Sequence, residues 1–207
     1  DPKRVKTSKV FPFRFLKALQ EIEALDFQPV NGGRKVVDAI IQAVDIAVDN
    51  VPEFAGKTLI AMDSSGSMFG KPWEIGSLFA SVLMKRNPGA DLMTFDSDAE
   101  YRNIRSSDSV LTIREKMPYN GGSTNFHAIF DTAKGKYDRI IILSDMQGWI
   151  GQYSPVQTFN EYKRKFTANP FIYSFDLNGY GTLQFPEQNV FAVAGFSEKI
   201  LDVMKYL

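Results

Sequence analysis

Short apolar runs and amphipathic stretches alternate along the chain, and their order predicts its secondary structure. Apolar residues recur at helical spacing over residues 10–25 and again over residues 34–49, so we expect two amphipathic helices at the start. Asn31, Gly32 and Gly33 lie between them and are typical of a break. From residue 53 onward, short apolar runs are separated by stretches with helical spacing. This part predicts strands over 58–62, 90–95, 139–143, 171–175 and 190–193, and helices over 110–117, 126–134, 156–166 and 197–207.

A strand that is followed by a helix and then by another strand favours a parallel sheet with helices on both faces. We therefore expect an α/β domain over residues 53–207, with a doubly wound, mostly parallel sheet flanked by helices. Residues 1–50 precede it as a short helical lead-in.

Polar residues cluster where the first predicted strand ends, and functional sites in such sheets gather in loops at the carboxyl ends of the strands. Asp63, Ser65 and Ser67 alternate directly after that strand. A turning backbone can therefore aim their three side-chain oxygens at one point. Taken singly, an acid or a serine at such a place is typical of a turn or a helix cap.

Two further oxygen donors occur in loops that belong to the same predicted edge of the sheet. Thr124 stands just before a predicted helix, and Asp145 follows the apolar strand 139–143. An all-oxygen set suits a hard cation such as Mg²⁺, and a hydroxyl-rich shell leaves one coordination position for a carboxylate from a partner. The predicted metal ligands are Asp63, Ser65, Ser67, Thr124 and Asp145.

The composition removes most other kinds of site. The 207 residues include no cysteine and one histidine, which excludes disulfide scaffolds, thiolate zinc sites, iron–sulfur clusters, thiol nucleophiles and multi-histidine metal sites. The 24 basic and 24 acidic residues balance, so no overall basic footprint for nucleic acid exists. Residues 1–20, however, carry six basic residues against one acidic residue. This surplus fits either a solvated end or part of a nucleic-acid-facing surface.

The sequence also bears on the cellular compartment. No apolar run reaches the roughly 18 residues of a membrane-spanning helix, and no signal peptide opens the chain, so we expect a cytoplasmic protein with no membrane partner. The first residue is Asp rather than Met, and we expect a trimmed part of a longer protein.

One known family carries this arrangement of donors. The Asp-x-Ser-x-Ser run that begins at Asp63, the position of Thr124 behind Gly121 and Gly122, and Asp145 after an apolar strand resemble the metal-ion-dependent adhesion site of von Willebrand factor A domains. The resemblance implies the Rossmann-like fold of these domains and a bound Mg²⁺, Mn²⁺ or Ca²⁺.

The same resemblance implies a role for each donor. Ser65, Ser67 and Thr124 would ligate the cation directly, whereas Asp63 and Asp145 would act directly or through water. Many A domains place the threonine immediately after the glycine pair, so the residue at position 123, a serine, is an alternative ligand to Thr124. A second departure is the pair Met-Gln at positions 146–147, where other members often carry more polar residues.

Residues near both ends of the chain resemble one particular group of proteins that contain such a domain. Residues 4–19, with the run SKVFPF, resemble the last part of the TROVE module of Ro ribonucleoproteins. Residues 175–181 and 195–197 are similar to the C-terminal end of bacterial and phage members. The resemblance implies a Ro-like protein reduced to its A domain and the last helices of an RNA-binding ring.

Membership of the Ro family implies a non-enzymatic role in non-coding RNA quality control, with no catalytic residue. In these proteins a ring of helical repeats holds the ends of misfolded non-coding RNAs, and Y RNAs bind its outer surface. The A domain closes the ring, and its metal site is expected to recruit a protein partner that offers an acidic residue. RNA binding is therefore expected through the ring module, most of which lies outside this chain.

Two other functions stay open. A Mg²⁺-dependent phosphohydrolase or phosphotransferase would use Asp63 as its nucleophile, and it would want a second acid where Ser65 stands. A free-standing A domain would mediate protein–protein adhesion, or would be purely structural with its metal site vacant.

Three weaker signals accompany these motifs. Asp96 and Asp98 are typical of a solvated turn, and His127 of a structural or exposed histidine, because no nucleophile accompanies it. Core packing, or an aromatic rim around the metal face, would account for Trp73, Trp149 and Tyr153.

Overall fold

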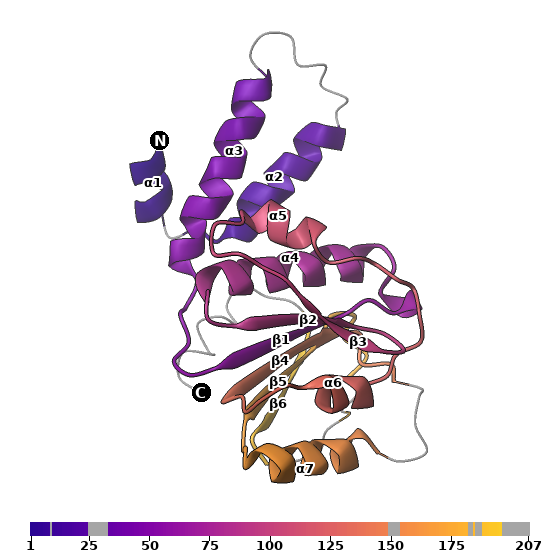
Figure 1. Ribbon diagram of the computed structural model, residues 1–207. Coiled ribbons are helices and arrows are strands. Elements are labelled where there is room, and N and C mark those ends of the chain that lie inside the picture. Colours follow the sequence, from indigo (N-terminus) through magenta and orange to yellow (C-terminus); the bar gives the residue numbers. More distant parts are fainter. Residues whose placement is uncertain (9, 25–32, 149–153, 182–183, 185–187, 196–207) are drawn as a thin grey trace. The chain divides into compact units, whose positions relative to one another are not determined.

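The computed structural model describes residues 1–8, 10–24, 33–148, 154–181, 184 and 188–195 (Figure 1). They belong to two compact units, one built on Asp1–Glu53 and the other on Phe54–Ser197. Within the described residues, no helix combines the length and the apolar character needed to cross a bilayer. The predicted helix over 197–207 and residues 31–32 of the predicted break lie outside the described residues.

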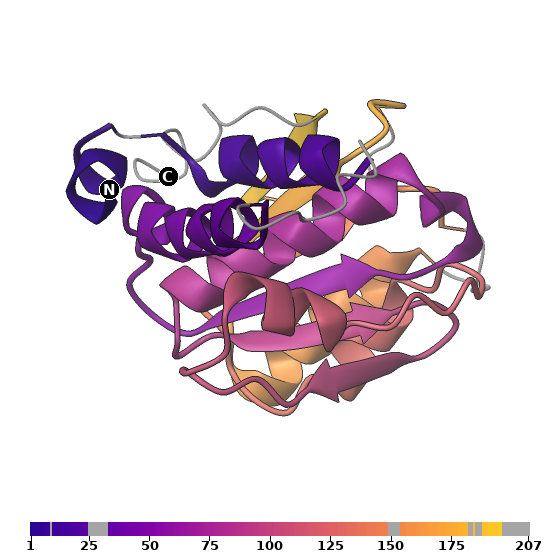
Figure 2. The same cartoon turned by 90° about the horizontal axis from the view of Figure 1, so that it is seen from above.

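The N-terminal unit contains both predicted lead-in helices. The elements of this unit are α1 (Pro2–Thr7), α2 (Pro12–Ala24), α3 (Gly33–Ala47) and the 3₁₀ turn η1 (Val48–Asn50). Helices α2 and α3 run side by side (Figure 2), and they bury Leu16, Leu19 and Val44. Helix α1 was not predicted; it begins where the Asp1 carboxylate accepts a hydrogen bond from the backbone N–H of Lys3 at 3.0 Å.

The second unit is built on a six-stranded sheet with strand order β3-β2-β1-β4-β5-β6. Its strands are β1 (Thr58–Asp63), β2 (Asp91–Phe95), β3 (Ala99–Arg102), β4 (Arg139–Ser144), β5 (Phe171–Asp176) and β6 (Val190–Ala194). Neighbouring strands are parallel except for β2 and β3. All five predicted strands are therefore confirmed. The additional strand β3 is a short, partly exposed edge strand, and its sequence lacks the apolar run that marks the others.

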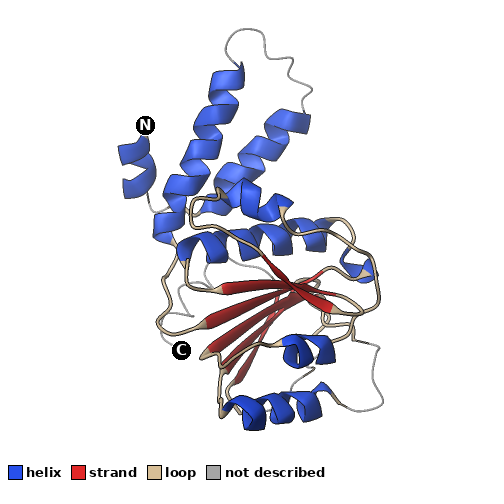
Figure 3. Cartoon of the chain, viewed as in Figure 1, coloured by secondary structure: helices blue, strands red, loops and turns tan. Residues whose placement is uncertain are grey.

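Helices cover both faces of this sheet, as predicted (Figure 3). Helices α4 (Lys71–Arg86) and α5 (Val110–Glu115) lie on one face, and α6 (His127–Thr132) and α7 (Pro155–Phe166) lie on the other. Helix α4 was not predicted. Every residue from position 76 to position 84 is buried, so the sequence of α4 shows no polar face that would mark helical periodicity.

Two apolar layers hold the central strands in place. The layer towards α6 and α7 brings Leu59 of β1 and Ile140 of β4 together with Phe130 and Phe159. On the opposite face, the rings of Phe79 in α4 and Phe175 in β5 meet edge to face at a centroid distance of 5.1 Å. Because β1 is buried at every position, its carboxyl end is held within the core.

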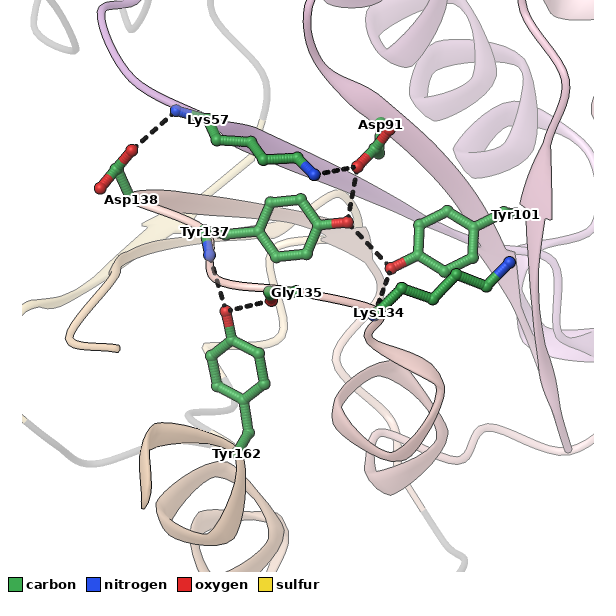
Figure 4. Close-up of polar contacts among 8 residues, drawn as sticks. All are labelled: Lys57, Asp91, Tyr101, Lys134, Gly135, Tyr137, Asp138 and Tyr162. Carbon is green, nitrogen blue, oxygen red and sulfur yellow. Dashed lines mark hydrogen bonds and ion pairs between the residues drawn. The ribbon is translucent and has the colours of Figure 1, made fainter. Parts of the chain in front are cut away.

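A network of tyrosines closes the opposite, amino-terminal edge of the sheet (Figure 4). The Tyr137 hydroxyl donates to Asp91 at 2.7 Å and lies 2.9 Å from the hydroxyl of Tyr101, while Lys57 pairs with Asp91 at 3.2 Å. The Tyr162 hydroxyl of α7 accepts from the backbone N–H of Tyr137 at 2.9 Å. Burial raises the pKa of Tyr162 to about 12, and burial with these hydrogen bonds raises the pKa of Tyr137 far above its ordinary value. Both hydroxyls therefore stay protonated at neutral pH.

Candidate metal centre

Asp63 is the last residue of β1 and lies fully buried at the carboxyl edge of the sheet. Its Oδ1 accepts from the backbone N–H of Ser65 at 2.8 Å, and its Oδ2 accepts from the hydroxyl of Ser144 at 2.5 Å. Burial raises the pKa of Asp63 to about 6; these hydrogen bonds oppose the rise, and the charge of Asp145 adds to it. A buried carboxylate with a second carboxylate nearby favours a bound cation.

The loop after Asp63 is anchored on two sides. The backbone N–H of Ser64 donates to the carbonyl of Phe95 at the end of β2, at 2.7 Å. On the other side, the N–H of Gly66 donates to the carbonyl of Gly122 at 2.8 Å, so that Ser65 and Gly122 form an isolated parallel bridge. These bonds fix the loop that carries the serine donors.

The two serines on this loop lie close together but differ in exposure. Their Oγ atoms are 3.4 Å apart; Ser65 is buried, whereas Ser67 is exposed. Ser67 follows directly from the turn at Gly66 within η2 (Gly66–Met68). The hydroxyl pair therefore spans from the buried carboxylates to the solvent, which is the direction from which a partner would approach.

The glycine pair brings the threonine loop close to this site. The backbone N–H of Gly121 donates to the carbonyl of Ser64 at 2.8 Å, and a Cβ atom at Gly66 would lie 3.3 Å from the carbonyl oxygen of Gly121, so the two loops approach closely through their backbones. Two residues further on, Thr124 is 3% exposed, and its neighbour Ser123 is exposed. The backbone N–H of Ser123 donates to the Ser97 hydroxyl at 3.2 Å.

Asp145 directly follows β4 and is 1% exposed. Its Oδ1 accepts from the backbone N–H of Gln147 at 3.2 Å, but its Oδ2 is buried with no hydrogen-bond partner. Leaving a buried carboxylate oxygen unpaired is costly, and a cation at this point removes the cost. Met146 adopts φ 59° and packs its side chain into the core, which accounts for an apolar residue at this position.

The donor set fits a hard divalent cation. It combines two buried carboxylates with neutral hydroxyls, and all the atoms are oxygen. In the part of the chain that the structure describes, no three acidic or histidine side chains converge on a metal-sized site. A cation here would therefore take hydroxyl oxygens in addition to the two carboxylates.

The structure thus places the predicted donors on neighbouring loops. Asp63 ends β1, Asp145 directly follows the adjacent strand β4, and the loop of Thr124 is hydrogen-bonded to that of Ser65. Sequence reasoning missed Ser144, which holds Asp63. The available signal was a hydroxyl that ends the apolar run of β4.

The structure also gives the contacts of the residues that formed the weaker sequence signals. Asp96 and Asp98 form the predicted turn, in which the N–H of Asp96 donates to the carbonyl of Asp98 at 2.8 Å. His127 is held structurally, with its Nδ1 2.5 Å from the hydroxyl of Thr158. Trp73 packs edge to face on Tyr119 at 5.5 Å, while residues 149 and 153 lie outside the described residues.

A mostly parallel six-stranded sheet with helices on both faces and an Asp-x-Ser-x-Ser loop at its carboxyl edge defines a von Willebrand factor A type of domain. Residues 57–207 match the Ro60 vWA domain family, and the chain belongs to this family.

A sequence match and a structural match to Ro proteins from Deinococcus radiodurans illustrate the relationship. The chain is 26% identical over 190 residues to a protein named RNA-binding protein RO60, covering 82% of this chain and 35% of that protein. The crystal structure of the Deinococcus radiodurans RO (RSR) protein superposes with a TM-score of 0.75 at 22% identity, over 99% of this chain and 45% of that one. The chain thus spans about a third of the length of the curated relative.

The fold extends to a more distant structure. An aerotolerance-related membrane protein from Bacteroides fragilis matches with a TM-score of 0.51 at 13% identity, over 72% of this chain and 96% of that one. At this identity the match shows a shared fold alone.

Proposed function

We propose that this chain is the divalent-cation-dependent binding domain of a Ro-like RNA-binding protein. In this proposal, Mg²⁺, or Mn²⁺ or Ca²⁺, binds at the carboxyl edge of the sheet, and an acidic residue of a protein partner completes its coordination. The observation that carries the proposal is the buried Oδ2 of Asp145, which has no hydrogen-bond partner and lies beside a second buried carboxylate.

The hydrogen bonds of the two carboxylates support different roles for them at the cation. Both oxygens of Asp63 already accept a hydrogen bond, so Asp63 suits a role through water, whereas Oδ2 of Asp145 is available to the ion directly. Ser65, Ser67 and Thr124 supply neutral oxygens. When bound, the cation provides an electrophilic centre that attracts a carboxylate.

Isothermal titration calorimetry with Mg²⁺ and Mn²⁺ tests the proposal. We expect saturable binding to the wild-type protein and its loss in the double variant Ser65→Ala/Ser67→Ala. Ser107→Ala, which removes an exposed serine hydroxyl away from the site, is the matched control and should bind as wild type does. Wild-type heat equal to that of buffer would favour a structural domain instead.

We further propose that the domain is not an enzyme. A phosphohydrolase would need Asp63 as a nucleophile, but this carboxylate is fully buried and both of its oxygens are engaged. Turnover of a generic phosphate ester that is abolished by Asp63→Asn would overturn this proposal.

RNA handling enters as a proposal about the larger protein. We propose for the larger protein a role in non-coding RNA quality control in the cytoplasm, with misfolded RNA or Y RNA bound through the ring module. The family and the relative named RNA-binding protein RO60 support the RNA-binding part of this proposal. In the N-terminal unit, part of the basic surplus is neutralised, because Lys6 pairs with Asp49 at 3.3 Å.

The basic lead-in has its own test. Changing Lys3, Arg4, Lys6 and Lys9 to Ala should weaken the binding of structured RNA and reduce its salt dependence, if the lead-in contacts phosphates. An unchanged salt slope would assign RNA binding to the ring module alone, or leave a free-standing A domain that mediates adhesion.

A further inference from the structure

A cluster of three aromatic side chains, one exposed and two half-buried, lies beside the candidate metal centre. We call it the aromatic shelf, and it consists of Phe69, Trp73 and Tyr119. Phe69 is 77% exposed, which is the largest exposed fraction among the big apolar side chains that the structure describes. Covering this ring with another apolar side chain would remove apolar surface from water, which is favourable.

Contacts among the three rings and with the metal loop hold the aromatic shelf in place. Tyr119 contacts both other rings, with centroid distances of 5.9 Å to Phe69 and 5.5 Å to Trp73. Its hydroxyl donates to the carbonyl of Gly66 at 3.1 Å. Gly66 is the residue between the two serine donors and is itself bonded to Gly122. The shelf and the metal loop therefore share one hydrogen-bonded framework.

The position of the shelf sets the spacing of its ligand. Phe69 is two residues beyond Ser67, the exposed donor, so their Cα atoms are at most about 7 Å apart. In an extended peptide, the Cα atom of the next residue lies about 3.8 Å from that of the acid, and the Cα atom of the residue after it lies about 7 Å away. A partner carboxylate at the cation would therefore place the side chain one or two positions away over the shelf.

We infer that the site selects a protein segment in which the acidic residue is flanked, within two positions, by a large apolar side chain such as Leu, Met or Phe. This inference rests on the proposed function, because the carboxylate is held by the cation. The charge of the ion selects the acid, and the rings select its neighbour.

Immobilised capped peptides test the inference in the presence of Mg²⁺ or of EDTA. The probes are Gly-Ser-Asp-Leu-Ser-Gly, the same peptide with Ser in place of Leu, and the same peptide with Asn in place of Asp. We expect the wild-type protein to bind the Asp-Leu peptide about tenfold more tightly than the Asp-Ser peptide, only with Mg²⁺, and not to bind the Asn peptide.

Variants separate the two layers of the proposal. Phe69→Ser should lose the preference for Leu and keep Mg²⁺-dependent binding of the Asp peptides. Tyr180→Ser, which removes a ring that is 62% exposed and outside the shelf, should keep the preference. Equal wild-type binding of the Leu and Ser peptides would overturn the proposed role of the aromatic shelf, but not the proposal that the cation binds an acidic residue. Binding that persists in EDTA, or to the Asn peptide, would overturn the metal–acid proposal, and no binding would overturn both.

Discussion

At the residue scale, burial separates the two hydroxyls that compete for one position in the candidate metal centre. Thr124 is buried in the loop that is hydrogen-bonded to the loop of Ser65. Ser123 is exposed, and its backbone N–H donates to the hydroxyl of Ser97. The sequence left this choice open, because both hydroxyls follow the glycine pair.

Thr124→Ala should therefore lower the affinity for Mg²⁺ by at least about tenfold, since it removes a proposed ligand of the cation. Ser123→Ala is the matched variant and should leave the affinity within a factor of two of wild type, which is about 0.4 kcal/mol. Calorimetric titration of both variants measures the contrast. A loss confined to Ser123→Ala would exchange the two roles.

The Ser144 hydroxyl bonds a predicted metal ligand, and such a supporting contact is harder to predict from the sequence than the ligands themselves. The spacing of the predicted ligands can be read directly from the Asp-x-Ser-x-Ser run. The contact of Ser144 with Asp63, which is 81 positions away in sequence, forms because β4 lies beside β1. We expect Ser144→Ala to weaken Mg²⁺ binding by about tenfold, because Asp63 loses the hydrogen bond that favours its charged form.

The control for that experiment is Ser64→Ala, which removes a buried hydroxyl that bonds the carbonyl of Phe95 rather than a carboxylate. It should lower the thermal midpoint without a comparable loss of metal affinity. Equal affinity losses in the two variants would point to loop disruption instead of support of Asp63.

At the scale of elements, five strands of the six-stranded sheet were predicted from the sequence, whereas helix α4 and the edge strand β3 were not. Apolar runs mark β1, β4 and β5, because parallel strands are buried on both faces. Helix α4 escapes the same reasoning, since burial on nearly all sides removes its polar face. The edge strand β3 escapes it because a strand with partly exposed side chains needs no apolar run.

The packing of α4 on β1 gives a prediction at this scale. A Cβ atom at Gly76 would lie 2.6 Å from Cε of Met62 and 2.8 Å from Cδ1 of Leu177, so Gly76→Ala forces buried side chains to move. Overpacking costs about 1–3 kcal/mol, and the better helix propensity of Ala returns about 1 kcal/mol. We expect a net loss of about 1 kcal/mol in the free energy of unfolding, measured by urea denaturation.

Gly89→Ala is the matched control, because a Cβ atom there meets nothing within 4 Å. It should be neutral or slightly stabilising through the unfolded chain. If Gly76→Ala were as stable as Gly89→Ala, the side chains around α4 would have room that their positions do not suggest.

At the scale of the whole molecule, the two edges of the sheet carry different tasks. The carboxyl edge carries the candidate metal donors, among them the buried Oδ2 of Asp145 with no hydrogen-bond partner, and the amino edge gathers tyrosines that hydrogen-bond one another (Figure 4). The sequence predicted the first edge, because its donors follow predicted strands in a recognisable spacing. It did not predict the second, because Tyr101, Tyr137 and Tyr162 meet only once β3, β4 and α7 are assembled.

The tyrosine network predicts how stability changes at alkaline pH. Tyr162 has an ordinary pKa of 10.0 when unfolded and about 12 when folded, so between these values the unfolded chain releases a proton that the folded protein keeps. Stability from this group is therefore complete below pH 10 and falls as the pH rises, by up to about 1.4 kcal/mol per pH unit.

Tyr162→Phe tests this by urea denaturation at pH 8, 9, 10 and 11. At pH 8 the variant should be about 1–2 kcal/mol less stable, because the backbone N–H of Tyr137 loses its buried acceptor. The deficit should shrink above pH 10, since phenylalanine carries no proton to lose. Tyr180→Phe, a change on an exposed ring, should follow the wild-type curve throughout. A deficit that stays constant to pH 11 would mean that Tyr162 ionises equally in the folded and unfolded protein, and the network would then owe its role to packing and neutral hydrogen bonds.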